Sequence, residues 1–310
     1  MAKRKRKPTL TQSIMSDVKD MCETIYENAN SRKQSYRHFK KFLLYCRENF
    51  FVKSFEECKE HIQSYANYLV ECGYSSFSVH TFLSSPCRLC GVPMNEIQKP
   101  KRRICDITRG RKSCKDSMES DLDNPRWSYL IEFQKSVGIR RNELKHLTSS
   151  DWLIENGNLY VYVRKGKGGK KQKQFIRPKD AEFIKSYFLN AKPGERIFDE
   201  SLFNNNLNLH KLRAQNAYAM YLELLEAVKK DKSLEVKIRK DITKRWYERK
   251  KKPIPKSLIE GYYTLRGENR ALAKKLNRPL SYSKLLVLWC SINLLSHYRL
   301  NVAICHYFLL

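Results

Sequence analysis

The stretch VGIRRNEL, at residues 137–144, places two adjacent arginines after a glycine and a glutamate three residues after the first arginine. The charged residues are Arg140, Arg141 and Glu143. Apolar residues at helical spacing surround them and would anchor a helix in a core, namely Val137, Ile139, Leu144 and Leu147. A solvated surface helix can carry such charges, so the meaning of this stretch depends on what the rest of the chain contains.

The charge of the whole chain is strongly unbalanced. Its 310 residues include 61 Lys and Arg against 32 Asp and Glu, which gives a formal net charge of +29. Such an excess indicates a polyanionic partner, most often nucleic acid. The length allows one large domain or two ordinary ones.

The sequence contains no pattern for membrane insertion or secretion. No apolar run reaches the roughly 18 residues that a spanning helix needs. The first residues, MAKRKRKPTL, are charged but lead into no apolar core, unlike a secretory signal. We therefore expect a cytoplasmic protein near the nucleoid, with no membrane partner.

The ten cysteines are expected to be reduced thiols in such a compartment. Cys87 and Cys90 have the C-x-x-C spacing of a metal site. The later pair, Cys105 and Cys114, is too widely spaced to complete a typical zinc site. Buried free thiols are the favoured interpretation, and we expect no metal.

The first part of the chain predicts a basic arm at residues 1–12 and an all-helical DNA-binding domain at residues 13–100. Apolar residues at three- and four-residue steps predict helices at residues 13–28, 32–49, 55–73 and 77–91. Residues 101–120 are polar and basic with little apolar periodicity, which is typical of a linker.

The second part, residues 121–310, predicts a mixed domain. Asn156-Gly157 is a strong turn signal, and residues 159–163 alternate as a strand does. A Gly- and Lys-rich turn leads into a return strand. Helices are predicted at residues 125–135, 138–147, 179–191 and 208–230, and a basic helical insertion at about 228–283. The fold class is therefore mainly α with a small antiparallel β-sheet.

Residues of the types that catalyse reactions occur along this part in the order described here. Arg140 comes first, then the turn RKGKGGKKQKQFI with Lys167, and then LHKLRAQNAY with His210 and Arg213. The stretch LLSHYRLNVAICHYF, with His297 and Tyr307, comes last. In this order and spacing the four stretches resemble the two arginine boxes, the lysine-bearing β-hairpin and the closing histidine and tyrosine of the tyrosine recombinase, or phage integrase, family.

Residue chemistry explains why such a set would suit attack on a phosphodiester. Two arginine forks can hold the non-bridging oxygens as negative charge develops in the transition state. A tyrosine hydroxyl, with a reference pKa of about 10, must lose its proton to become a nucleophile. His210 lies one helical turn from Arg213 and is the candidate to accept that proton.

The resemblance implies the remaining roles. It implies a helical core-binding domain followed by a catalytic domain, with Lys167 protonating the 5′ leaving group and Lys165 as its competitor. His297 would donate a hydrogen bond to the phosphate, and Tyr307 would form a 3′-phosphotyrosine. Because that bond conserves energy, no cofactor is implied. We expect Glu143 to support Arg140 or the neighbouring helix, and Arg141 to face DNA or solvent.

The resemblance also implies double-stranded DNA as the partner, a homotetramer on DNA, accessory DNA-bending proteins and a role in a mobile genetic element. The sequence departs from the family pattern at Ala214, where another histidine is usual, and in the long stretch 214–296 before His297. Two alternatives stay open, an inactive DNA-binding protein of the same fold and a type IB topoisomerase-like enzyme.

Overall fold

The computed structural model describes residues 9–103, 124–203 and 207–310, and the chain divides into two units, Met1–Arg103 and Ile104–Leu310. Most of the expected basic arm, most of the expected linker, and both Cys105 and Cys114 lie outside the described residues.

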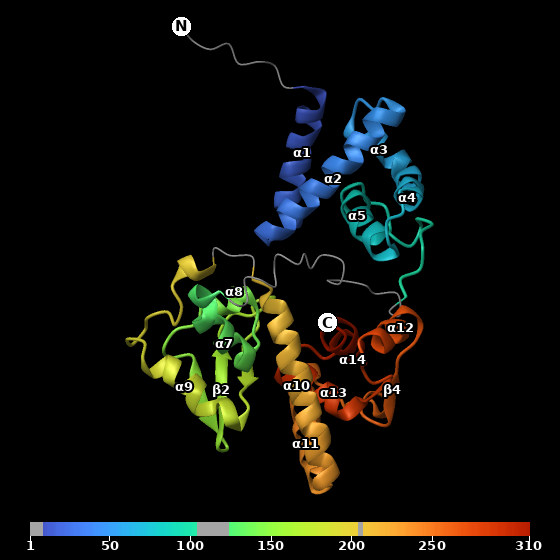
Figure 1. Ribbon diagram of the computed structural model, residues 1–310. Helices are drawn as coiled ribbons and strands as arrows, with labels where there is room; N and C mark the ends of the chain where they lie inside the picture. The colour runs from blue at the N-terminus through green and yellow to red at the C-terminus, as the bar shows by residue number, and fades with distance from the viewer. Residues whose placement is uncertain (1–8, 104–123, 204–206) are drawn as a thin grey trace. The chain divides into compact units, whose positions relative to one another are not determined.

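The first unit is built from helices alone in its described residues (Figure 1). They are α1 (Leu10–Ile25), α2 (Ala29–Phe50), α3 (Phe55–Cys58), the short 3-10 helix η1 (Lys59–His61), α4 (Ile62–Glu71) and α5 (Ser76–Leu89). Side-chain oxygens of Thr9, Asn28, Ser54 and Ser75 accept hydrogen bonds from the first turns of α1, α2, α3 and α5. These caps satisfy backbone donors that have no partner within a helix.

The core of the first unit forms between α2 and its neighbours. Phe39, Phe42 and Leu43 on α2 are fully buried. The buried hydroxyls of Ser35 and Ser85 lie 2.7 Å apart and join α2 to α5. The exposed side of α2 carries its lysines and arginines, so burial follows the helical period of the sequence.

The second unit begins with η4 (Pro125–Trp127), α7 (Ser128–Val137) and the very short α8 (Arg141–Leu144). A three-stranded antiparallel sheet follows, made of β1 (Trp152–Glu155), β2 (Asn158–Val163) and β3 (Gln172–Phe175), in that spatial order. Asn156 and Gly157 both have positive φ, at 51° and 74°, and join β1 to β2 through the expected two-residue turn.

Helices make up most of the rest of this unit. They are η5 (Pro178–Asp180), α9 (Ala181–Leu189), η6 (Glu200–Phe203), α10 (Leu209–Lys230), α11 (Ser233–Lys250), η7 (Lys256–Leu258), α12 (Gly267–Lys275), α13 (Lys284–Asn293), α14 (Leu300–Ala303) and the π-helix η8 (Ile304–Phe308). Two short strands, β4 (Tyr262–Thr264) and β5 (Ser281–Ser283), pair antiparallel.

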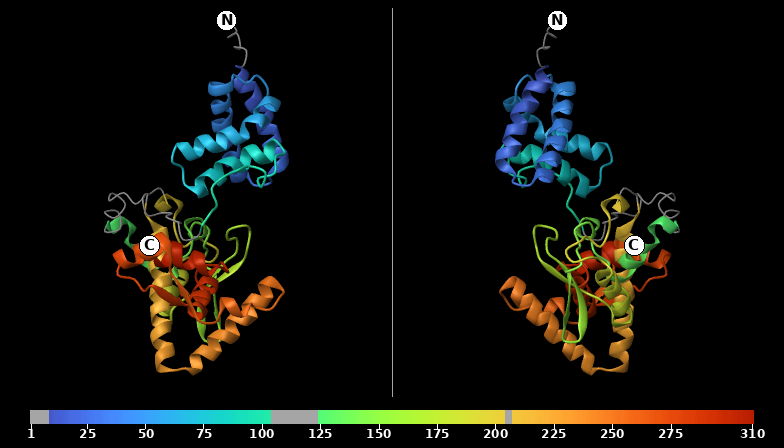
Figure 2. Two further views of the ribbon diagram at one scale, coloured as in Figure 1. Left: turned by 90° about the vertical axis from the view of Figure 1, so that its right-hand side faces the viewer. Right: turned by 90° about the vertical axis from the view of Figure 1, so that its left-hand side faces the viewer.

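The long helix α10 is central to the second unit because it contacts α7, α13 and η8. It therefore brings the segment after α7 near the end of the chain. Figure 2 shows α10 and α11 diverging from their short connection, and α11 packs on α13. Buried Ile238, Ile242 and Trp246 form the inner side of α11.

The expected fold class is confirmed, since the described chain is mostly helical with small antiparallel sheets. Two local expectations were wrong. Residues 138–147 are not one helix, because Gly138 has a left-handed φ of 66° and Arg140 is extended. The region 228–283 is not wholly helical, because it contains the paired strands β4 and β5.

The described cysteines are free thiols. Cys72 is exposed and Cys90 is half-buried, while the other described cysteines are buried as expected. Among the described helices, none combines the length and apolar character needed to cross a membrane.

Candidate active site

Three buried amide side chains hold the turn between α7 and α8. Gln134 Nε2 donates to the carbonyls of Ile139, at 2.6 Å, and Leu209, at 2.9 Å. Gln174 Nε2 donates to the Val137 carbonyl at 2.7 Å, and Asn216 Nδ2 to the Ser136 carbonyl at 2.6 Å. Because these donors come from α7, β3 and α10, the turn has a fixed place between all three elements.

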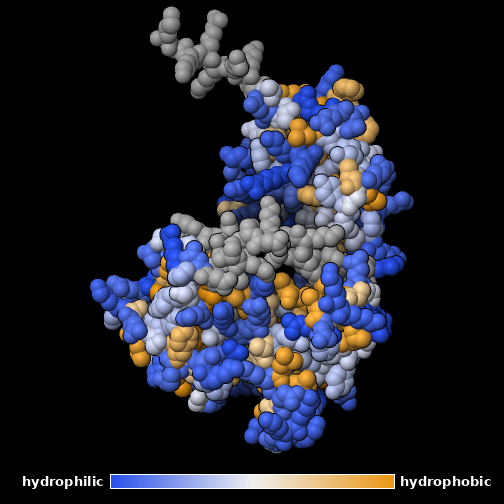
Figure 3. Space-filling model, in the orientation of Figure 1, coloured by the Kyte–Doolittle hydropathy of each residue, from blue (hydrophilic) through white to orange (hydrophobic). Residues whose placement is uncertain are grey.

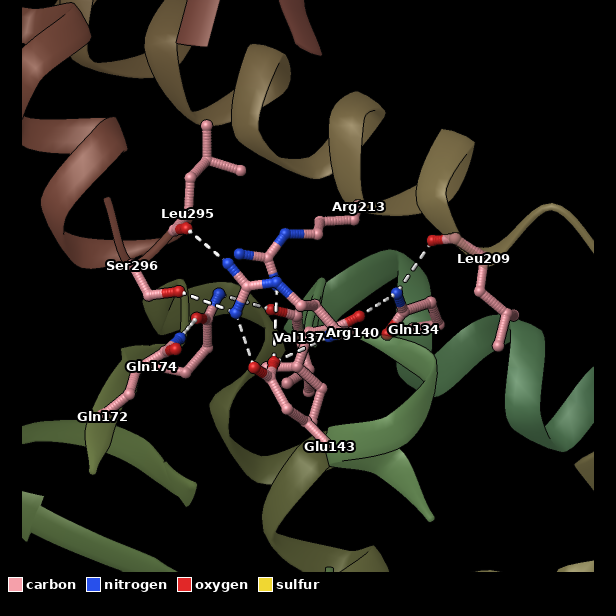
Figure 4. A network of polar contacts seen from close by, with 11 residues as sticks. Gln134, Val137, Arg140, Glu143, Gln172, Gln174, Leu209, Arg213, Leu295 and Ser296 are labelled. Atoms are coloured by element: carbon pink, nitrogen blue, oxygen red, sulfur yellow. Dashed lines mark hydrogen bonds and ion pairs between the residues drawn. The ribbon is translucent and has the colours of Figure 1, made fainter. Parts of the chain in front are cut away.

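Arg140 follows this turn directly and is held by Glu143. Its backbone N–H donates to Glu143 Oε2 at 2.8 Å, and its Nη1 lies 2.5 Å from Glu143 Oε1. Nη1 also donates to Ser296 Oγ at 3.1 Å, and Nη2 to the Leu295 carbonyl at 3.4 Å. Figure 4 shows these contacts joining the arginine to the segment after α13.

Glu143 also faces Arg213, the arginine of the second box. The Arg213 Nη1 atom lies 3.6 Å from Glu143 Oε2, and both side chains are almost fully buried, at 1% and 2% exposure. One carboxylate therefore lies between two guanidinium groups. Both of the supporting contacts considered for Glu143 are present, one to Arg140 and one to a neighbouring helix, where Arg213 on α10 is the partner.

The Arg213 guanidinium is incompletely satisfied. Among the described residues, none of its three nitrogens has a hydrogen-bond partner, although all three are buried. Burial lowers the pKa of Arg213 from its usual high value, and Tyr307 and Glu143 oppose that lowering. Since a buried donor without an acceptor is costly, this geometry favours an added anion.

Tyr307 lies beside this guanidinium. The centre of the Arg213 guanidinium is 5.9 Å from the centroid of the Tyr307 ring. The His210 and His297 rings lie 4.9 Å and 5.6 Å from the same ring, centroid to centroid. The structure thus brings Arg140, Arg213 and these three rings close together.

The two histidines differ in their surroundings. His210, at the start of α10, is exposed, and packing around the imidazole lowers its pKa, with Arg213 and Arg140 adding to the effect. His297 is half-buried, and burial lowers its pKa to about 3, with the same two arginines contributing. Both imidazoles are therefore neutral near pH 7 and able to accept a proton.

Lys167 is not brought into contact with these residues. It is exposed in the turn between β2 and β3, and Lys165 is exposed in the same turn. The turn itself lies close to the site, because a Cβ on Gly166 would lie 3.2 Å from Glu143 Oε1. The assignment of one lysine over the other stays a prediction.

The expectation for Arg141 was wrong. Its guanidinium is half-buried and donates to the backbone carbonyls of Phe203, at 3.3 Å, and Leu207, at 2.5 Å. It therefore binds the backbone at the end of η6 and just before α10, and is not free to face DNA or solvent.

Sequence reasoning missed the residues that orient the site. Gln134, Gln174 and Asn216 have no motif that separates them from surface amides, and their role depends on burial. Ser296 has a positive φ of 51°, and Ser291 lies under His297. A left-handed serine beside a motif histidine has no clear sequence signal, whereas in the structure its hydroxyl contacts Arg140.

No group of three or more His, Cys, Asp or Glu in the described ranges is arranged to hold a metal ion. The candidate site is therefore described by its own side chains: two arginines, one carboxylate, two neutral imidazoles and one phenol.

Comparison with known proteins gives structural likenesses only. No family model matches the sequence, and no curated protein matches it. The chain is similar to a solved structure of the XerH site-specific recombinase bound to difH substrate in a pre-cleavage complex, with 13% identity, coverage of 69% of this chain and 86% of that one, and a TM-score of 0.37. It is also similar to the crystal structure of XerA recombinase, with 17% identity, coverage of 67% and 84%, and a TM-score of 0.24.

Proposed function

We propose that this chain is a site-specific DNA recombinase that cuts and rejoins DNA through a 3′-phosphotyrosine at Tyr307. The observation that carries the proposal is the buried Arg213 guanidinium, whose nitrogens make no close hydrogen bond among the described residues. It shares the Glu143 carboxylate, at 3.6 Å, with Arg140, and it lies beside Tyr307. A phosphodiester is an anion that supplies those acceptors and also presents a centre for the tyrosine to attack.

The proposed step can be written atom by atom. The Tyr307 oxygen bonds to phosphorus as the bond to the 5′ oxygen breaks, and its proton passes to a neighbouring imidazole. The 5′ oxygen leaves with the electron pair and takes a proton from a hairpin lysine, for which Lys167 remains our choice. Arg140 and Arg213 bind the non-bridging oxygens, and the developing charge strengthens those bonds in the transition state.

The wider setting belongs to the same proposal. The formal charge of +29 suits duplex DNA as the partner. The same family resemblance implies a homotetramer on paired DNA sites, accessory DNA-bending proteins and a role in a mobile genetic element.

A suicide substrate tests the reaction, because its cut strand diffuses away and traps covalent protein. We expect the full-length protein to form a covalent complex with a DNA duplex carrying its sites, and Tyr307→Phe to form none while still binding DNA. Tyr298→Phe is the matched control, since Tyr298 is in the same segment but its hydroxyl lies 3.5 Å from the Arg245 carbonyl. A complex in Tyr307→Phe but not in Tyr298→Phe would refute the assignment.

The alternatives give different products. A type IB topoisomerase-like enzyme would relax supercoiled plasmid without needing paired sites, and an inactive DNA-binding protein would give no covalent complex. Exchange between paired sites, without relaxation of a plasmid that lacks them, is the outcome that supports a recombinase.

The lysine role has its own test. A bridging 5′-thio phosphate needs no proton on its leaving group, so it should restore cleavage to Lys167→Ala. Restoration of Lys165→Ala instead would move the role to that residue.

A further inference from the structure

Ser291 makes a set of contacts that determines which ring nitrogen of neutral His297 carries the hydrogen. Its Oγ lies 2.8 Å from His297 Nδ1, 2.5 Å from the His297 carbonyl and 3.5 Å from the Arg299 carbonyl. The Arg299 backbone N–H donates to the same oxygen at 3.4 Å. Ser291 is fully buried near the end of α13, so water does not compete for these bonds.

The hydroxyl has only one hydrogen to donate. Carbonyl oxygens can only accept, and the nearest is the His297 carbonyl at 2.5 Å, so that hydrogen is committed to it. The Ser291 oxygen must then accept from His297, which requires a hydrogen on Nδ1. In the neutral imidazole the other nitrogen, Nε2, carries a lone pair instead.

Nε2 is the atom left for chemistry. It is buried and has no hydrogen-bond partner among the described residues. Its ring lies 5.6 Å from the Tyr307 ring, centroid to centroid. This differs from the role implied by the family resemblance, because a bare lone pair cannot donate a hydrogen bond to a phosphate.

His210 is the competing acceptor, and it lacks this preparation. The described contact of its ring is packing against Tyr307, 4.9 Å between centroids, and such packing does not select a tautomer.

We propose that His297, oriented by Ser291, accepts the Tyr307 proton at Nε2, and that Ser291 is the positioning residue for this transfer. This inference rests on the proposed cleavage reaction. The Tyr307 hydroxyl hydrogen passes to Nε2, the phenolate oxygen attacks phosphorus, and the imidazole becomes a cation with hydrogen on both nitrogens. That cation can return the proton to the tyrosine oxygen when the phosphotyrosine bond breaks in the rejoining step.

Bound DNA would strengthen this acceptor. Burial lowers the pKa of His297 most, and positive charge on Arg213, Arg140, Arg299 and His306 lowers it further. A phosphate between the arginines would oppose that repulsion and raise the pKa. The free protein therefore holds a weak base that becomes stronger when substrate arrives.

The tautomer can be measured without any reaction. In nitrogen NMR of the full-length protein labelled with 15N-histidine, we expect the His297 resonances of a neutral ring with hydrogen on Nδ1, assigned by their loss in His297→Gln. Ser291→Ala should lose this single tautomer. A ring with hydrogen on Nε2 in the unaltered protein would overturn the proposal.

The transfer itself can be tested by chemical rescue. Difluorotyrosine at position 307 ionises far more readily than tyrosine, so it needs a proton acceptor less. On a suicide substrate, His297→Gln should slow covalent-complex formation by ~10²–10⁴-fold, the range for general acid–base catalysis, and difluorotyrosine should restore most of that loss.

His210→Gln provides the matched comparison, and difluorotyrosine should not restore it. Any other pattern, including rescue of His210→Gln alone, of both variants or of neither, overturns the assignment. If the unaltered protein forms no covalent complex, the proposed recombinase function fails, and the NMR result still decides the tautomer.

Discussion

At the scale of single residues, the charge around Glu143 is out of balance. One carboxylate serves Arg140 at 2.5 Å and Arg213 at 3.6 Å, so one positive charge remains. Removing one partner of a buried ion pair typically costs roughly 3–5 kcal/mol, because the other charge stays buried. Here the excess charge is present in the folded protein itself, and substrate phosphate would balance it.

Arg213→Met should separate stability from activity. The change leaves Arg140 and Glu143 as a balanced pair, so we expect an unfolding free energy equal to or above that of the unaltered protein. Cleavage should slow on the order of 10²–10³-fold, as for the loss of one donor to a developing anion. Urea denaturation and single-turnover cleavage measure the two effects.

Glu143→Gln should lower the unfolding free energy, unlike Arg213→Met. It leaves the buried guanidinium of Arg213 and the partly exposed one of Arg140 without a carboxylate, and we expect a loss of roughly 3–5 kcal/mol in unfolding free energy. Glu235→Gln is the control, because Glu235 pairs with Arg239 at 3.3 Å on the open face of α11, where such pairs contribute less than about 1 kcal/mol. Equal losses in the two variants would contradict the buried charge balance.

The low pKa of His297 predicts a dependence of stability on pH. Its folded pKa is about 3, whereas an unfolded histidine titrates near 6.5. Between these values the unfolded chain binds more protons, so the unfolding free energy decreases as pH falls, by at most about 1.4 kcal/mol per pH unit. His297→Gln should flatten this decrease. Urea denaturation between pH 7 and pH 4 measures this. The same dependence of unfolding free energy on pH in His297→Gln and in the unaltered protein would contradict the prediction.

At the scale of elements, the turn between α7 and α8 places Arg140. Gly138 has a φ of 66°, and a Cβ there would lie 3.2 Å from Asn216 Nδ2. The hydrophobic spacing of VGIRRNEL predicted a core-facing segment correctly, and Ile139 and Leu144 are fully buried. It could not predict where the helix breaks, because that depends on hydrogen bonds from amide side chains on α10 and β3.

Gly138→Ala should therefore disturb both stability and cleavage. A side chain strains the left-handed backbone by about 1–2 kcal/mol, and contact with Asn216 adds to it. Gly157→Ala is the matched control, since Gly157 has a φ of 74° but no atom within 4 Å of the added Cβ. A loss in Gly138→Ala no larger than that in Gly157→Ala would show that Asn216 does not constrain the turn.

The outer face of α11 is a second element with a testable role. Two of its acids are paired within the helix, as Glu235 pairs with Arg239 and Asp241 with Arg245. Figure 3 shows hydrophilic residues where α10 passes into α11. Lys237, Lys240 and Lys244 are exposed and form no ion pair with any described residue. They recur at three- and four-residue steps, so they share one face.

These three lysines suit a DNA backbone. The variant with all three changed to glutamine should bind duplex DNA more weakly and lower the slope of log affinity against log salt by roughly 2–3, at about 0.9 per phosphate contact. Fluorescence anisotropy over a range of salt concentrations gives the slope.

The control variant removes the same number of positive charges from lysines outside α11. Lys179, Lys185 and Lys192 each pair with a glutamate, namely Glu223, Glu182 and Glu195. Changing these three to glutamine should leave the slope nearly unchanged. Equal slopes for the two triple variants would mean that the α11 face has no special contact with DNA.

At the scale of the whole molecule, sequence patterns predicted long elements better than short ones. The helices of the first unit, α10 and the β2–β3 pair were predicted from periodicity, because burial of one face imposes a period on the sequence. The strands β4 and β5 have three residues each, too few to show alternation. The motif residues around Tyr307 were found from their order, whereas Ser291, Gln134 and Gln174 depend on contacts between distant segments.

The most direct measurement is the mass of the peptide that remains linked to DNA. The full-length protein, trapped on a suicide substrate and digested with nuclease and protease, should yield the peptide containing Tyr307 with a nucleotide joined through a 3′-phosphate. That result would place the attacking oxygen beside the unsatisfied guanidinium of Arg213, as the account requires. A nucleotide attached to any other residue, or trapped complexes with no covalent linkage, would contradict it.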